Sequence, residues 1–156
     1  MEFYRKSILI FLIAFISCSQ LNHLKSSKQI SFTINKIDIW FDAMPKIESP
    51  SLLHFNIDFI LKNPTDKKIE IDSLNFEVYS DKNLVSVFYP VNASQIFLNP
   101  FQVEKFNYNL STTGSNELLK SESRKSRIYM NLFFKSSGNS FNEKFLAGEK
   151  EIQVVY

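Results

Sequence analysis

The chain has 156 residues, and its eighteen Lys and Arg stand against sixteen Asp and Glu, which gives a net charge of +2 at neutral pH. A balance so close to zero argues against a protein that binds nucleic acid or another polyanion by general electrostatic attraction. A single cysteine excludes a disulfide within the chain, so an apolar core rich in the sixteen Phe and six Tyr must hold the fold.

The first seventeen residues have the layout of an export signal. Arg5 and Lys6 precede an unbroken apolar run of nine residues, Ile8 to Ile16. A permanent membrane helix needs about 20 apolar residues, whereas a signal core is roughly 7 to 15 long. Residues 1–17 are therefore predicted to be a signal peptide that is removed after export.

The end of this run and the two residues after it, Phe15-Ile16-Ser17-Cys18, resemble the lipobox of bacterial lipoproteins. The resemblance implies that diacylglycerol is attached to the thiol of Cys18 and that the bond before it is cut. The alternative is an ordinary cysteine beside an ordinary signal. Cys18 is the only cysteine, ends the apolar run and precedes a polar segment, which favours the lipid-anchored interpretation. Two or three acyl chains, at about 0.8 kcal/mol per buried CH₂, hold a protein firmly on a membrane.

Residues 18–29 are predicted to be the lipidated N-terminus and a flexible tether, because Ser19 to Gln29 has few bulky apolar residues. Eleven coil residues span about 18 Å on average, which keeps the folded body close to the membrane. Residues 30–156 are predicted to form one domain, a suitable length for a single core.

From Ile30 onward the apolar residues alternate with polar ones, the period of a strand with one buried face. Ile30, Phe32 and Ile34 form one row, and Ile37, Ile39 and Phe41 continue it after a slip of one residue, which indicates a β-bulge. Further rows are expected at these places: Leu53 to Leu61, Ile69 to Val78, Leu84 to Tyr89, Gln95 to Leu98, Phe101 to Leu110, Ile128 to Phe134, Phe141 to Phe145 and Glu151 to Tyr156.

Prolines and glycines fall between these rows, as turns between strands require. Ser115 to Glu122 lacks alternation, and a small polar residue there precedes acidic and helix-forming residues. One short helix is therefore predicted to begin near Ser115.

Phe59-Ile60-Leu61-Lys62-Asn63-Pro64-Thr65 leads into a strand from Ile69 to Tyr79. This segment resembles the late-embryogenesis-abundant group 2 domain, also called the water-stress and hypersensitive-response (WHy) domain. The resemblance covers about Leu53 to Val87, and a glycine common after the middle strand of that family is absent. It implies an all-β fold: an antiparallel immunoglobulin- or fibronectin-III-like β-sandwich of about seven to eight strands with one short helix.

The Asn63-Pro64 pair also has a physical interpretation of its own. Pro64 keeps Asn63 out of the helical region and lacks a donor, so it ends the strand, and the Asn63 side chain can cap the turn that follows.

Candidates for chemistry are few, and we predict no catalytic residue, metal site or cofactor. His23 falls in the tether, and His54 lies on the less buried face of a strand, roughly 13 Å along it from Asp58. Glu70, Asp72 and Glu77 alternate on the outer face of a strand. A catalytic carboxylate pair and a solvated surface are both compatible with that spacing, and the solvated surface is favoured.

Two further features have both a functional and a plain interpretation. The basic cluster Ser121 to Arg127 suits anionic lipid headgroups or, preferably, a solvated loop. The abundant Phe residues suit a ligand cavity or, preferably, a sandwich core, because six of them sit on alternating rows: Phe32, Phe55, Phe59, Phe76, Phe106 and Phe134.

Two functions are carried forward. The first is a membrane-anchored, non-enzymatic envelope lipoprotein, protective or structural under water or osmotic stress by family resemblance. The second is an interaction module, an adhesin or assembly subunit that binds an envelope protein at a sheet edge or loop. Ser19, which is not acidic, favours an outer-membrane or periplasm-facing location over retention at the inner membrane. The partner, leaflet and oligomeric state are left open.

Overall fold

The computed structural model describes residues 29–43, 50–91, 96–114 and 124–156. Within these ranges the chain forms nine strands: β1 (Ser31–Asp42), β2 (Leu52–Lys62), β3 (Ile69–Ser80), β4 (Asn83–Phe88), β5 (Ile96–Leu98), β6 (Val103–Thr113), β7 (Lys125–Ser136), β8 (Asn139–Glu151) and β9 (Gln153–Val155).

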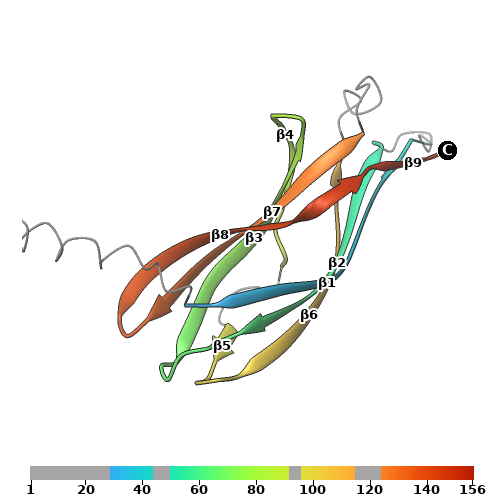
Figure 1. The fold of residues 1–156 in the computed structure, drawn as a ribbon. Coiled ribbons are helices and arrows are strands. Elements are labelled where there is room, and N and C mark those ends of the chain that lie inside the picture. The colour runs from blue at the N-terminus through green and yellow to red at the C-terminus, as the bar shows by residue number, and fades with distance from the viewer. Residues whose placement is uncertain (1–28, 44–49, 92–95, 115–123) are drawn as a thin grey trace, which may run out of the picture.

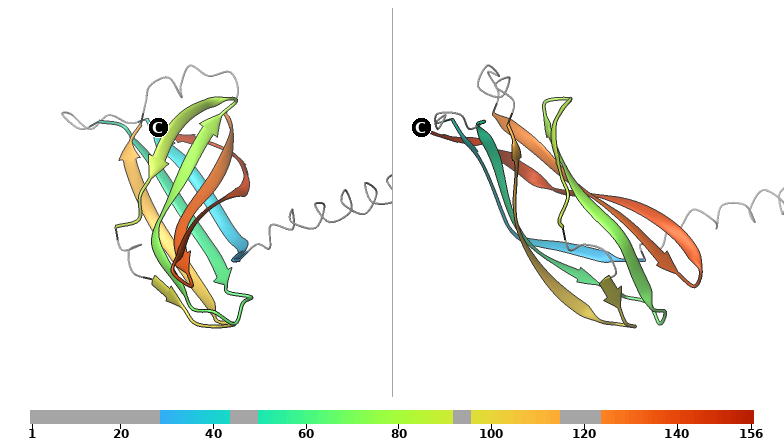
Figure 2. Two further views of the ribbon diagram at one scale, coloured as in Figure 1. Left: turned by 90° about the vertical axis from the view of Figure 1, so that its left-hand side faces the viewer. Right: turned by 180° about the vertical axis from the view of Figure 1, so that it is seen from behind.

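The strands form two sheets that pack face to face as a β-sandwich (Figures 1 and 2). Sheet A has the order β6-β2-β1-β9, and sheet B has the order β4-β3-β7-β8 with β5 also paired to β3. All pairs are antiparallel except β1 with β9, which run parallel.

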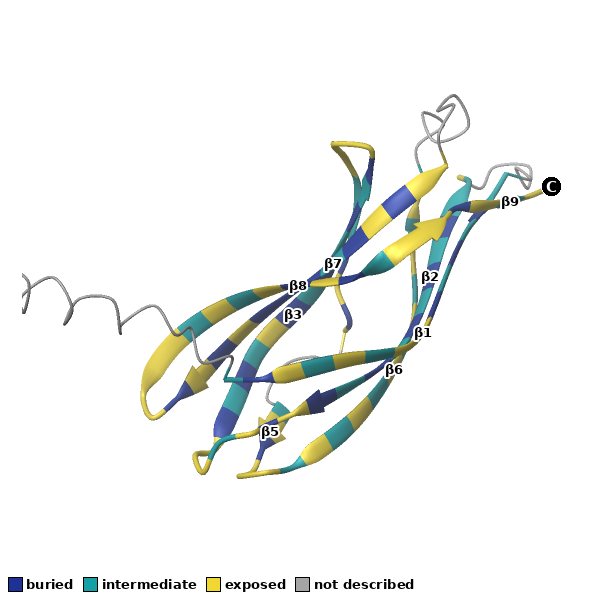
Figure 3. Cartoon of the chain, viewed as in Figure 1, coloured by how far each residue is buried: buried dark blue, intermediate teal, exposed yellow. Residues whose placement is uncertain are grey.

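The alternating sequence determines which face of each strand is buried. On β2, Leu53, Phe55, Ile57, Phe59 and Leu61 are all fully buried, while the residues between them are half-buried. The same alternation colours β3 and β7 in Figure 3. The predicted aromatic core is confirmed, since Phe55, Phe59, Phe76 and Phe134 are fully buried and Phe32 and Phe106 pack against them.

The predicted bulge in the first strand is also confirmed. The register of β1 against β2 shifts between Ile34 and Lys36, so Asn35 has no opposite residue. The extra residue moves Ile37, Ile39 and Phe41 onto the same core face as Ile30, Phe32 and Ile34.

The two ends of the sandwich are distinct (Figure 1). Strand pairing and the short β2–β3 turn bring five strand ends together at one end of the sandwich: Ser31, Lys62, Val103, Ile69 and Ser136. We call this the proximal end. The distal end carries the other termini of the same strands, with the β3–β4 turn and β9. Strands of eleven to thirteen residues separate the ends by roughly 35–40 Å.

The C-terminal strand joins the two sheets. Glu151 still pairs with Lys125 in sheet B, whereas Gln153 pairs with Trp40 in sheet A. Ile152, buried between them, makes the crossing, and its amide donates to the carbonyl of Arg124. Alternation predicted two strands over residues 141–156, and two are present, but β8 is longer than expected and runs from Asn139 to Glu151.

The fold-class prediction is all-β as expected but wrong in its detail. The structure has nine strands instead of about seven to eight, and the described residues contain no helix. The helix predicted from Ser115 falls in residues 115–123, which lie outside the described residues. The excess lies in the two shortest strands, β5 and β9, which have three residues each and fall within the rows expected at Gln95 to Leu98 and Glu151 to Tyr156.

Candidate functional site

The predicted lipidation site, Cys18, lies outside the described residues, as do His23, the signal segment and the tether up to residue 28. The first described residue, Gln29, donates its amide to the Glu143 carboxylate on β8 at 3.3 Å. Ile30 is fully buried. The chain therefore enters the sandwich at its proximal end, directly before β1.

Asn63 is fully buried in the turn after β2, and its side chain joins two turns (β2–β3 and β5–β6). Its Nδ2 group donates to the carbonyls of Lys67 at 2.7 Å, Leu98 at 3.2 Å and Asn99 at 3.0 Å. Its Oδ1 accepts from the amide and the hydroxyl of Thr65 at 3.0 and 2.7 Å. Because an amide has two N–H bonds and two lone pairs, every bonding position is used and one N–H is shared.

Pro64 is exposed beside it and has no amide hydrogen to satisfy. Asn63 and Pro64 thus build a turn and form no open site. The turn they hold is the proximal one that also fixes Asn99, at the start of the β5–β6 connection.

His54 lies against an aromatic side chain. Its ring stacks on Trp40 of the neighbouring strand, with centroids 5.0 Å apart and planes 11° from parallel. Within the part of the chain that the structure describes, no three His, Cys, Asp or Glu residues are grouped closely enough to hold a metal ion.

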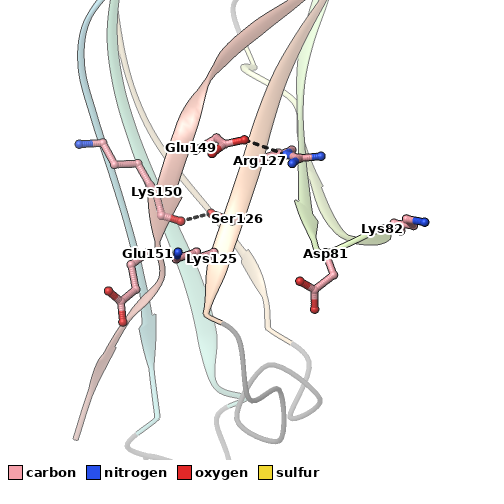
Figure 4. Close-up of a pocket in the computed structure, with 8 residues that line it drawn as sticks. All are labelled: Asp81, Lys82, Lys125, Ser126, Arg127, Glu149, Lys150 and Glu151. Carbon is pink, nitrogen blue, oxygen red and sulfur yellow. Dashed lines mark hydrogen bonds and ion pairs between the residues drawn. The ribbon is translucent and has the colours of Figure 1, made fainter.

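A charged groove, with a cavity volume of about 520 Å³, lies on sheet B at the distal end (Figure 4). Arg127 Nε pairs with Glu149 Oε1 at 2.8 Å across β7 and β8, and the Ser126 hydroxyl donates to the Lys150 carbonyl at 2.8 Å. The whole lining comprises Asp81, Lys82, Lys125, Ser126, Arg127, Glu149, Lys150 and Glu151. Four cations against three anions leave this distal groove slightly positive.

A second hollow of about 400 Å³ adjoins the groove, since both are lined by Asp81, Lys82 and Arg127. It adds Tyr79 and Tyr129, whose rings meet edge to face at 5.8 Å. Lys144 Nζ lies 5.3 and 4.8 Å from the two ring centroids. Aromatic rings beside cations suit a planar or ring-shaped anionic ligand or an acidic peptide.

Two of the three carboxylates picked out by alternation, Asp72 and Glu77, are ion-paired on the outer face of sheet B. Glu77 Oε2 lies 2.7 Å from Lys144 Nζ and accepts from the Tyr79 hydroxyl at 3.0 Å, and Asp72 pairs with Lys135 at 2.9 Å. The hydrogen bond from Lys144 is the main reason that the pKa of Glu77 is lowered. The same bond raises the pKa of Lys144. Glu77 is thus a stable anion at neutral pH and a poor proton donor.

The groove was not foreseen from the sequence as a site. The sequence marks only the basic stretch ending at Arg127, and it favours a solvated loop there. Lys125 to Arg127 instead begin β7. Glu149 and Glu151 come from β8, Tyr79 from β3 and Asp81 from the β3–β4 turn, and only Tyr129 shares β7 with the basic residues. The pairing that brings these strands together leaves no local signal in the sequence.

No family model matches the chain, and no curated protein matches its sequence. A structural-genomics target solved by X-ray crystallography has a similar fold, with a TM-score of 0.54 at 9% identity over 80% of this chain and 86% of that chain. A protein from Archaeoglobus fulgidus gives a TM-score of 0.52 at 12% identity over 80% and 99% of the two chains. At these identities the likeness shows the fold alone.

A Bacillus subtilis protein named as a candidate lipoprotein gives a TM-score of 0.44 at 15% identity, over 79% of this chain and 38% of that one. That score is too low to argue from. Among the described residues there is also no helix with the length and apolar character needed to cross a bilayer.

Proposed function

We propose that the chain is a membrane-anchored lipoprotein of the bacterial envelope. The observation that carries the proposal is Cys18, the only cysteine, placed at the end of a nine-residue apolar run. Ile30 supports it, because the body starts there and leaves Ser19 to Gln29 as the connection. The non-acidic Ser19 favours the outer membrane or a periplasm-facing leaflet.

Metabolic labelling with a clickable palmitate tests the anchor. The wild-type chain and a Ser19→Ala control should carry the label and stay on membranes through a high-salt wash, whereas Cys18→Ala should carry none. An unmodified Cys18 thiol, found by mass spectrometry in a soluble product, would refute the proposal.

The body itself is proposed to be non-enzymatic and to protect or organise the envelope under water or osmotic stress, as the WHy resemblance implies. The buried Asn63 supports the resemblance, since it gives the Asn-Pro pair a structural reason to exist. Deletion of the gene should lower survival of drying and osmotic shock, and the wild-type gene should restore it while Cys18→Ala should not. Unchanged survival of the deletion strain would remove the stress role.

An interaction module is the second candidate, and the distal groove favours it. The groove lies at the end of the sandwich opposite Gln29, and its lining, with that of the adjoining hollow, offers charged and aromatic groups to a partner. Cross-linking in intact cells, followed by purification of the anchored chain, should yield one stoichiometric protein. That protein should be lost with Arg127→Glu and Lys144→Glu and kept with Lys36→Glu, a surface lysine on sheet A. Absence of any such protein favours the protective role.

A further inference from the structure

Three large apolar side chains are exposed at the proximal end. Phe97, Phe101 and Val103 are 44%, 64% and 51% exposed and lie within seven residues of sequence. Val103 is paired with Lys62 at the end of β2, and Phe97 is paired with Glu70 at the start of β3. The register turns Val103 to the outer face of sheet A beside Lys62 and Phe97 to the outer face of sheet B beside Glu70. These two side chains therefore flank the proximal end on opposite faces, with the turn that carries Phe101 between them, and contribute little to the core.

The backbone at Phe101 is unusual for a bulky residue. Asn99 to Gln102 form a turn closed by the Gln102 amide on the Asn99 carbonyl at 3.1 Å, with Pro100 second and Phe101 third. Phe101 has a φ of 59°, the left-handed conformation in which glycine or asparagine is usual. Phe101 gains little burial and adopts an unfavourable backbone conformation, so it does not stabilise the fold in water. A contact outside the folded domain explains an aromatic residue at this position better.

The turn that carries Phe101 is firmly held. The Phe101 amide donates to the Thr65 carbonyl at 3.2 Å, and the Asn63 side-chain amide donates to the carbonyls of Leu98 and Asn99. The apolar side chains are thus presented on a rigid base.

The tether ends at the same place. Ser31 pairs with Lys62, and Lys62 pairs with Val103, so the start of β1 lies two strands, or roughly 10 Å, from Val103. The eleven residues from Ser19 to Gln29 span about 18 Å. Any lipid on Cys18 thus holds this end against the bilayer.

The charges around the apolar side chains suit a membrane surface. Four exposed lysines lie near them, at positions 62, 67, 68 and 105, against three acidic residues, Asp66, Glu70 and Glu104. Lys68 Nζ lies 3.9 Å from the ring centroid of Phe97, so the aliphatic stem and the ring form one amphipathic unit. Aromatic and lysine side chains together are typical of the boundary between headgroups and acyl chains.

The geometry points to a second membrane contact: a proximal docking surface, formed by Phe97, Phe101, Val103 and Lys68, that inserts into the same bilayer that holds the lipid. This inference rests on the proposed anchor at Cys18. The anchor alone leaves the body free to tumble on its tether, whereas the docking surface fixes the sandwich upright with the distal groove turned outward.

The test uses the full lipidated chain in phosphatidylcholine–phosphatidylglycerol vesicles with brominated acyl chains, which quench indoles that enter the bilayer. In the double variant Phe101→Trp, Trp40→Phe, fluorescence should fall about twofold relative to unbrominated vesicles. The matched control Leu84→Trp, Trp40→Phe places an indole at an exposed distal residue and should not be quenched. Flotation with the vesicles after a salt wash reports the anchor separately.

Phe101→Gly separates docking from folding. Glycine adopts a positive φ without strain, so the urea midpoint should stay equal or rise, while an environment-sensitive dye on Asp66→Cys should lose its membrane shift. An unquenched indole at position 101 on protein that floats would overturn the docking surface and leave the anchor intact. Protein that fails to float would overturn both, and a lower urea midpoint for Phe101→Gly would assign Phe101 to folding.

Discussion

A fully buried amide destabilises a protein unless each of its polar atoms has a partner, and Asn63 shows how closely a residue can be specified by that condition. Three carbonyls face its Nδ2 and two donors face its Oδ1. Aspartate offers no donor to the carbonyls, and alanine satisfies neither group. Only an amide of this length fits both.

Replacement of Asn63 should therefore be costly. Asn63→Ala leaves several buried or half-buried groups without partners, and we expect the free energy of unfolding to fall by about 3 kcal/mol. Asn63→Asp should be at least as damaging at neutral pH, because a carboxylate would face three carbonyl oxygens. Urea unfolding followed by circular dichroism measures this, with Asn109→Ala on the exposed face of β6 as a near-neutral control.

Glycine is required at position 114 because a side chain there would collide with Phe41, and its backbone conformation is not the reason. A Cβ atom there would overlap Cε2 of Phe41, which is fully buried. Gly114→Ala should lower the free energy of unfolding by about 2 kcal/mol through overpacking. Gly138→Ala, which meets no atom within 4 Å but has a φ of +80°, should cost only about 1 kcal/mol, so an equal loss in both would contradict the contact argument.

At the scale of elements, one unpaired residue keeps the core face of β1 continuous. Asn35 lies between Ile34 and Lys36, where the register shifts. Deleting Asn35 would point the core residues of one half of the strand toward solvent, since side chains alternate between the two faces with a period of two. We expect the deletion to abolish the cooperative thermal transition and Asn35→Ala to leave it within a few degrees of the wild type. A folded deletion variant would show that the strand tolerates the wrong phase.

The ion pair between Glu77 and Lys144 joins β3 to β8 across β7 and gives a modest pH dependence. The lowered pKa of Glu77 means that its contribution is present above the unfolded value near 4.5 and is lost as the pH falls through the folded value. The raised pKa of Lys144 means that its contribution is lost only as the pH rises above about 10.5.

Because both groups are partly exposed, Glu77→Gln should cost less than about 1 kcal/mol at pH 7. The difference from the wild type should shrink at pH 3, as measured by urea unfolding at the two pH values. If the difference in free energy of unfolding grew on acidification, the ion pair with ionised Glu77 would not be its source.

The elements show where sequence reasoning works and where it stops. The slip at Asn35 and the buried Phe rows follow from period and phase, which are local properties. The stack of Trp40 on His54 and the contact of Lys144 with Tyr79 and Tyr129 depend on the register in which strands pair, which alternation within one strand does not specify. No window along the chain contains that register, so the distal groove could not be predicted.

For the whole molecule, the separation of the two ends predicts a measurable height. Cys18 is consumed by lipid under the proposed function, so an introduced cysteine is a unique labelling site. A donor dye on Asp66→Cys should transfer energy strongly to acceptor lipids in vesicles, and one on Lys82→Cys, roughly 35–40 Å farther along the strands, should transfer little. Equal transfer from the two positions would mean that the sandwich lies flat.

The parallel pairing of β9 with β1 has a mechanical consequence. Trp40, Phe41 and Asp42 pair with Gln153, Val154 and Val155, and the Ala43 amide adds a bond to the Val155 carbonyl. A force that pulls Tyr156 away from the anchored end slides these two strands past each other, so all their hydrogen bonds bear the load together. An antiparallel hairpin pulled at its open end would instead unzip one bond at a time. The sandwich is thus arranged to resist tension between the bilayer and whatever holds its far end.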